Sequence, residues 1–183
     1  MVMVRSGVLC LLILWGIIFS FGLACAIAQD QEEDPATKQY REDYDRFQKL
    51  LAIGDPIKKA DGLLTFLTQR PDSKLADYAQ GNYLQILETF AKGEKYQNVL
   101  TLAERFIKSR PRVGETYYFY GVALKNLQRY PEAMDALAKC YVMKNRASAK
   151  ARDFLEFIYK SQNQGNIVGV EKVIKKAQGE VGK

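Results

Sequence analysis

The chain has 183 residues, 48% of them apolar, with 27 lysines and arginines, 21 acidic residues, a formal net charge of +6 and no histidine. Serine–histidine and cysteine–histidine nucleophile pairs, imidazole-based zinc sites, histidine-ligated haem and histidine titration near neutral pH all need an imidazole. The composition therefore excludes these chemistries.

The first 28 residues have the three parts of a secretory signal peptide. A short start carrying Arg5 is followed by an almost wholly apolar stretch over residues 8–23, and no charged residue occurs between Arg5 and Asp30. The small–x–small triplet that ends at Ala28 is typical of a cleavage site. We predict a signal peptide over residues 1–28, cleaved after Ala28. The rest of the chain is then extracytoplasmic, in the periplasm or cell envelope or secreted.

Two alternatives for this segment remain open. The apolar run approaches the roughly 20 residues that span a bilayer, so residues 6–28 could instead stay in the membrane as an uncleaved anchor. Cys25 could carry a lipid, as in bacterial lipoproteins, although Gly22 stands where that signal has a large aliphatic residue. Cleavage would also remove Cys10 and Cys25. Only Cys140 would then remain, and a single cysteine forms no disulfide within the chain.

The rest of the chain is predicted to be helical after a short spacer. Residues 29–36 are acidic and contain no large apolar residue, which indicates a flexible spacer. Over residues 37–178 apolar side chains recur every three or four positions, as in amphipathic helices. Prolines and glycines divide this domain into about eight helices of about 12 to 19 residues joined by short turns. Residues 179–183 remain as a tail. We expect an all-α fold of consecutive antiparallel helical hairpins.

A 34-residue spacing relates two parts of this domain. Tyr83 and Tyr117 are 34 residues apart, as are Tyr96 and Tyr130. Around both pairs large and small side chains follow a similar order, although few positions are identical. A fixed period of this length is typical of a solenoid, in which each helical hairpin packs on its neighbours.

The clearest unit resembles a tetratricopeptide repeat. It reads Tyr117-x2-Tyr120-Gly121-x2-Leu124-x8-Ala133-x3-Leu137-x2-Cys140, and its order of large and small residues is similar to the pattern of that family. The unit of residues 80–113 matches less closely but has the closing proline, Pro111, where the later unit has Asn145. The resemblance implies helical hairpins stacked as a short right-handed superhelix, whose concave face holds a peptide or helix of another protein. Weaker units flank these two at residues 38–71 and 148–178.

Residues of the repeat pattern are expected to hold the hairpins together. Gly121 has no side chain where the second helix of its hairpin must cross, and Ala133 and Cys140 offer small surfaces to the facing helix. Cys140 has two interpretations, a small core residue or a reactive thiol, and its place in the pattern favours the core. The predicted packing residues are Tyr83, Tyr96, Tyr117, Gly121, Leu124, Tyr130, Ala133, Leu137 and Cys140.

The resemblance also implies which side chains line the concave groove. Tyr118 and Phe119 would offer aromatic anchors beside the polar side chains of Lys125 and Asn126. Alternatively, the aromatic run of residues 117–120 only packs the core and the next hairpin. The predicted groove residues are Gln85, Glu88 and Lys92 in one unit, Glu115, Tyr118, Phe119, Val122, Lys125 and Asn126 in the next, and Arg152 and Glu156 in the last.

No catalytic motif accompanies these helices. The sequence has no phosphate loop, no metal-ligand spacing and no glycine-rich nucleotide turn. We therefore expect no enzymatic activity, no cofactor and no metal. Residues 56–183 hold 22 basic and 13 acidic residues, a net charge of +9, but the basic residues are dispersed along the helices. This dispersal and the predicted export argue against nucleic acid and favour a solvated, soluble surface.

Two functions remain open on the sequence. The first is an exported adaptor or scaffold of the cell envelope, whose groove holds a peptide or helix of another protein. The second is a membrane-tethered structural subunit, whose repeats pack permanently against a larger envelope complex. A cleaved, soluble domain favours the adaptor, whereas a retained anchor and partners that co-purify favour the subunit.

Overall fold

The computed structural model describes residues 34–182, and in that range all regular structure is α-helical. The chain divides into two units, residues 1–41 and residues 42–183, and the first helix begins in the first unit. The helices are α2 (Pro35–Leu51), α3 (Pro56–Gln69), α4 (Ala76–Lys92), α5 (Tyr96–Ser109), α6 (Gly114–Asn126), α7 (Tyr130–Val142), α8 (Ser148–Gln162) and α9 (Val170–Val181).

The predicted leader lies outside the described residues, as does most of the spacer predicted over residues 29–36. The end of that spacer is helical, because α2 already begins at Pro35. The carboxylate of Asp34 accepts a hydrogen bond from the backbone N–H of Thr37 (3.2 Å). Asp34 thereby caps the helix, and proline fits its first position because the missing N–H would have had no helical partner. Within residues 34–182, no helix combines the length and apolar character needed to cross a bilayer.

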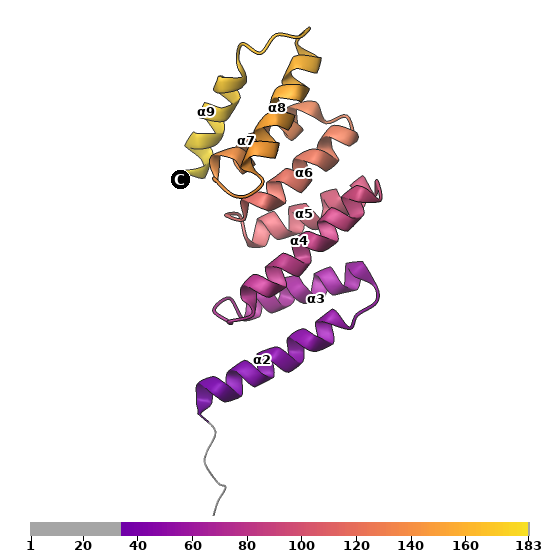
Figure 1. Ribbon diagram of the computed structural model, residues 1–183, viewed down its shortest axis with the longest axis vertical. Coiled ribbons are helices and arrows are strands. Elements are labelled where there is room, and N and C mark those ends of the chain that lie inside the picture. The colour runs from indigo at the N-terminus through magenta and orange to yellow at the C-terminus, as the bar shows by residue number, and fades with distance from the viewer. Residues whose placement is uncertain (1–33, 183) are drawn as a thin grey trace, which may run out of the picture. The chain divides into compact units, whose positions relative to one another are not determined.

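The second unit is a stack of helical hairpins. The helices from α3 to α7 each pack against the next helix in the chain (Figure 1). Helix α4 also contacts α6, and α6 contacts α8, so the first helices of successive hairpins lie side by side. The all-α fold of stacked antiparallel hairpins predicted from the sequence is thus confirmed.

Helix α9 departs from this order. It packs mainly against α7 and touches α8 only slightly, and residues 163–169 form a longer connection than those between the preceding helices. It also continues to Val181, so that residues 179–181 of the predicted tail are helical.

The 34-residue spacing of the sequence recurs in the backbone hydrogen bonds that end α4 and α6. After α4, the N–H of Lys95 donates to the carbonyl oxygen of Phe90 (2.9 Å), and after α6 the N–H of Arg129 donates to that of Leu124 (2.8 Å). Such a bond from beyond the helix to its last turn needs a residue of left-handed backbone between donor and helix. The residues with this backbone are Glu94 (φ 56°) and Gln128 (φ 62°).

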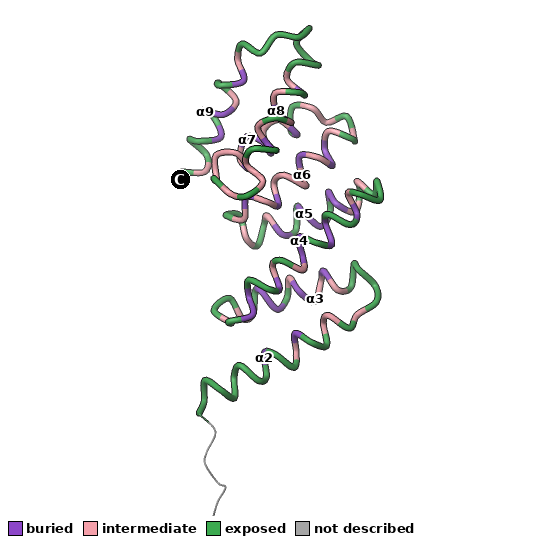
Figure 2. The backbone as a smooth tube through the Cα atoms, viewed as in Figure 1, coloured by how far each residue is buried: buried purple, intermediate pink, exposed green. Residues whose placement is uncertain are grey.

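Buried residues recur along the helices of the second unit and form its core, whereas most residues of the turns are intermediate or exposed (Figure 2). Tyr83 is fully buried, with its ring centroid 4.5 Å from that of Phe106. Its hydroxyl donates to the carbonyl oxygen of Leu102 (2.9 Å), which satisfies the polar end of a buried ring. Of the predicted packing residues, Tyr83, Gly121, Leu124, Ala133, Leu137 and Cys140 are buried, whereas Tyr96, Tyr117 and Tyr130 are half-buried against the core.

Gly121 of α6 lies close to Leu137 and Ala133 of α7. A Cβ on Gly121 would lie 2.7 Å from Cγ of Leu137 and 3.3 Å from the carbonyl oxygen of Ala133. The first of these distances is too short for two carbon atoms, whose optimal separation is about 3.5–4.0 Å. Glycine at this position therefore permits the helices to cross as closely as they do.

Cys140 is a core residue in this structure. Its side chain has no exposed surface, and burial raises the pKa of the thiol to about 11. At neutral pH the thiol therefore stays protonated, and the thiolate needed for nucleophilic or redox chemistry is scarce.

Candidate partner-binding groove

A groove of about 740 Å³ crosses the first helices of three successive hairpins. On α4 its lining recurs at intervals of three or four residues, which places the side chains on one face of the helix. The lining comprises Gly81, Leu84, Gln85, Glu88, Ala91 and Lys92 of α4, Glu115, Tyr118, Phe119 and Val122 of α6, and Arg146, Ala147 and Lys150 of the α7–α8 turn and α8.

Two aromatic side chains occupy the middle of this lining. The ring centroids of Tyr118 and Phe119 are 5.6 Å apart and the rings are nearly perpendicular, at 71°. Both side chains are half-buried. Burial raises the pKa of the Tyr118 hydroxyl, so the phenol stays neutral and can donate or accept a hydrogen bond.

Charged side chains surround the aromatic pair. Glu88 forms an ion pair with Lys92 on the same helix (2.8 Å), and Glu115 of α6 forms one with Arg146 of the α7–α8 turn (3.3 Å). The hydrogen bond from Lys92 lowers the pKa of Glu88, with smaller effects from the charges of Lys150 and Arg146. Glu88 is therefore ionised at neutral pH and lies in a positively charged environment.

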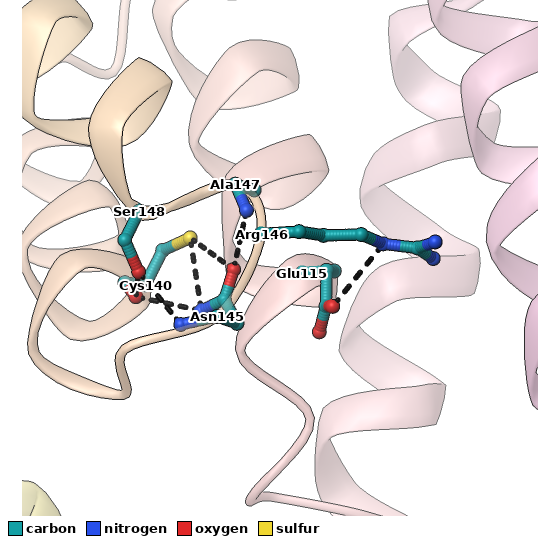
Figure 3. A network of polar contacts seen from close by, with 6 residues as sticks. All are labelled: Glu115, Cys140, Asn145, Arg146, Ala147 and Ser148. Atoms are coloured by element: carbon teal, nitrogen blue, oxygen red, sulfur yellow. Dashed lines mark hydrogen bonds and ion pairs between the residues drawn. The ribbon is translucent and has the colours of Figure 1, made fainter.

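The turn between α7 and α8 is held by the side chains of Asn145 and Ser148. The amide nitrogen of Asn145 donates to the carbonyl oxygen of Cys140 (2.8 Å), and its amide oxygen accepts from the N–H of Ala147 (2.8 Å). The N–H of Asn145 donates to the hydroxyl of Ser148 (2.8 Å). Figure 3 shows Arg146 extending from this turn to Glu115 on α6. Asn145 thus holds the residue next to it at the groove.

A second recess of about 440 Å³ adjoins the groove on the α8 side. Tyr118, Val122 and Lys150 line both cavities, so the two are continuous. The rings of Phe154 and Phe157 on α8 also line the recess and are stacked, with centroids 6.2 Å apart and planes 17° apart. Phe157 is 58% exposed, a large value for an aromatic side chain on a helix that also packs the core.

Most of the groove residues predicted on α4 and α6 lie together in this lining: Gln85, Glu88, Lys92, Glu115, Tyr118, Phe119 and Val122. Lys125 and Asn126 do not line either cavity. Asn126 is exposed at the end of α6, where its amide nitrogen donates to the carbonyl oxygen of Val122 (2.9 Å), and Lys125 is half-buried in the same turn.

Arg152 and Glu156 also lie away from the groove, which corrects the prediction for α8. Arg152 donates to Glu156 (3.0 Å), to Glu171 in the first turn of α9 (2.7 Å) and to the hydroxyl of Tyr141 on α7 (3.2 Å). These partners lie on α7, α8 and α9, whereas the groove lies on α4, α6 and α8. Helix α9 packs against α7, and this brings Glu171 within reach of Arg152. The flank of α8 that carries Arg152 and Glu156 is therefore occupied by an ion-pair network.

The opposite flank of α8 supplies the groove residues that the sequence reasoning missed. Lys150, Phe154 and Phe157 are spaced by four and three residues and so share one side of the helix. That spacing, together with two aromatic residues one turn apart, was a signal in the sequence. Arg146 has no such signal, since it lies in a turn.

Residues 34–182 contain no cluster of three or more side chains that could hold a metal ion. Comparisons of the chain with protein-family models, with curated proteins and with solved structures find no match.

Proposed function

We propose that this chain is an exported, non-catalytic interaction module, an adaptor or scaffold, that holds a segment of another protein in the groove over α4, α6 and α8. The observation that carries the proposal is the composition of that groove. Two half-buried aromatic rings, Tyr118 and Phe119, are surrounded by polar and charged side chains. Central aromatic residues with a polar rim are the usual arrangement of protein-binding surfaces.

The module that we propose is of the tetratricopeptide type, with which the arrangement of the helices is compatible. Helices α4, α6 and α8 alternate with α5 and α7 along the chain and contact one another in sequence order. Successive units then contribute equivalent faces to one extended surface, which suits an elongated ligand such as a peptide or a helix. The 34-residue spacing of the sequence and of the turns after α4 and α6 supports the same proposal.

Export is part of the proposal and is supported by the sequence of residues 1–28. An uncharged apolar stretch that ends in Ala26-Ile27-Ala28 is typical of a signal peptide. Retention in the membrane through residues 6–28 would keep the groove in the same compartment. The partner is then a protein of the cell envelope or the exterior.

Photocrosslinking from single positions tests the proposal. A photoreactive amino acid is placed at Gln85 or Val122, which line the groove, and, as matched controls, at Thr101 or Lys108, which are exposed on α5. In intact cells we expect a discrete protein adduct from the groove positions and none from α5. Tyr118→Ala should lower the yield, because truncating a central aromatic residue commonly costs about 1 kcal/mol or more of binding free energy.

Each pattern of crosslinks has a clear meaning. Adducts from the groove alone that diminish with Tyr118→Ala support the proposal. Equal adducts from the groove and from α5 indicate a subunit enclosed in a larger complex. The absence of any adduct from both groove positions contradicts a partner in the groove.

A further inference from the structure

The junction between the groove and the recess has a distinctive chemistry. Three residues, Tyr118, Val122 and Lys150, line both cavities. On one side of this junction lies the recess with the stacked rings of Phe154 and Phe157. An occupant of both cavities would therefore contact Lys150 and place a group against two aromatic rings.

Lys150 is the cation of the groove lining that forms no ion pair with any residue in the range 34–182. Glu88 is paired with Lys92 and Glu115 with Arg146, whereas Lys150 has no ion pair or hydrogen bond within residues 34–182. The groove lining thus has three cations and two carboxylates, a net charge of +1. Asp153 is exposed one turn along α8 and lines the recess only.

The recess has the size and lining to take a large apolar side chain. It is a shallow recess of about 440 Å³ that is open to solvent and lined in part by the two phenylalanine rings. Phe157 is 58% exposed although its neighbours Leu155 and Ile158 are buried. A partner side chain that covers this ring would remove apolar surface from water.

We infer that the groove recognises a protein segment in which an acidic side chain stands beside a large apolar one: the apolar side chain fills the recess at Phe154 and Phe157, and the carboxylate pairs with Lys150. This inference rests on the proposed function and names the chemistry of the partner. A nucleic acid is disfavoured because the groove lining has a net charge of only +1, whereas binding to a phosphate backbone relies on many cations.

Selection from a library of short random peptides displayed on phage tests the inference with the full-length protein as target. We expect enrichment of Asp or Glu next to Phe, Leu, Ile, Trp or Met. For a synthetic peptide of the enriched sequence, Lys150→Glu should weaken binding by about tenfold, because it exchanges an attractive for a repulsive charge pair in a partly exposed site. Selection against Lys150→Glu should favour Lys or Arg at the same place.

Two further variants separate the apolar from the charged contribution. Phe157→Ala should abolish the apolar preference and keep the acidic one, and its high exposure leaves the fold intact. Lys108→Glu, an equal change of charge at an exposed lysine on α5, should leave binding unchanged within about twofold. Thermal unfolding of each variant verifies that it is folded.

The outcomes distinguish this inference from the proposed function. The inference would be overturned if the enriched peptides had no preference for an acidic residue, or if selection against Lys150→Glu gave the same acidic preference. Either result would leave a peptide-binding groove in place. Loss of binding that is equal for Lys150→Glu and Lys108→Glu would reduce the effect to net charge and also overturn it. No enrichment of any peptide would count against the proposed function itself.

Discussion

The crossing of α6 and α7 at Gly121 can be tested by adding a single methyl group. In Gly121→Ala the new Cβ would lie 2.7 Å from Cγ of Leu137, 3.0 Å from Cδ2 of the same side chain and 3.3 Å from the carbonyl oxygen of Ala133. Leu137 is fully buried, and protein cores are close-packed, so its side chain has little room to move. The oxygen belongs to the backbone of α7, so relief at that point requires a shift of the helix.

Two opposing effects set the magnitude. Alanine is favoured over glycine within a helix by about 1 kcal/mol. Overpacking a close-packed core costs about 1 to 3 kcal/mol. The free energy of unfolding of Gly121→Ala should therefore fall by about 0 to 2 kcal/mol, and that of Gly121→Leu should fall further, since its side chain is larger.

Gly81 provides the matched control. It also lies within a helix, α4, but a Cβ there would have no heavy atom within 4 Å. Gly81→Ala should therefore raise the free energy of unfolding by up to about 1 kcal/mol, or roughly 2–4 °C in Tm for a protein of this size. Urea and thermal unfolding of the two variants should differ by about 1 to 3 kcal/mol, with Gly121→Ala the less stable.

A second substitution identifies the clash as the cause. Leu137→Ala should itself be destabilising by about 2 to 5 kcal/mol, because it leaves a cavity in the core. In that background Gly121→Ala should become stabilising, since the atoms that it would meet at 2.7 and 3.0 Å are gone. If Gly121→Ala stabilises the parent protein as much as Gly81→Ala does, the close crossing is refuted.

Three further predictions concern other positions. Glu94→Gly and Gln128→Gly should each raise the free energy of unfolding by about 0.5–1 kcal/mol, because glycine adopts the left-handed backbone of these two residues without strain. A lower free energy of unfolding in urea would contradict this. Thr116→Val should raise it by about 1 kcal/mol, since the buried Thr116 hydroxyl has no hydrogen-bond partner within residues 34–182; destabilisation would reveal one. Burial raises the pKa of the Cys140 thiol from 9.0 to about 11, so between pH 9 and 11 the unfolded chain releases a proton that the folded protein keeps, and stability falls as pH rises. Measured by urea unfolding, the free energy of unfolding of Cys140→Ala should fall by up to about 2 kcal/mol less between pH 9 and 11 than that of the parent protein. Identical pH profiles of the two proteins would contradict a raised pKa.

The helices could be predicted because their signals are local. At the start of α3 the carboxylate of Asp55 accepts a hydrogen bond from the N–H of Lys58 (2.7 Å), and Pro56 occupies the first helical position. Both features follow from residue type and spacing. The α4 and α6 faces of the groove were implied by the resemblance to the tetratricopeptide repeat, whose 34-residue period relates Gln85 to Phe119 and Glu88 to Val122.

The α8 face of the groove could not be derived in this way. Extending the period from Tyr118 and Val122 gives Arg152 and Glu156, which lie on the flank next to α7 and α9. Both flanks of the buried stripe Ala151, Leu155 and Ile158 carry polar and aromatic residues. Which flank faces the groove depends on where α9 packs, which is a tertiary property that the repeat period does not give.

The turn at Asn145 shows how the core and the groove depend on each other. The repeat pattern has a proline at this place, but proline has no N–H, and the N–H of Asn145 donates to Ser148. The Asn145 amide also bonds the carbonyl oxygen of Cys140, a fully buried residue of α7. Arg146 follows directly and Lys150 lies one turn later on α8. The hydrogen bonds of Asn145 to the buried end of α7 therefore help to set where Arg146 and Lys150 lie relative to Glu115 and Tyr118. A substitution in the core at this turn would then alter the groove without changing any residue that lines it.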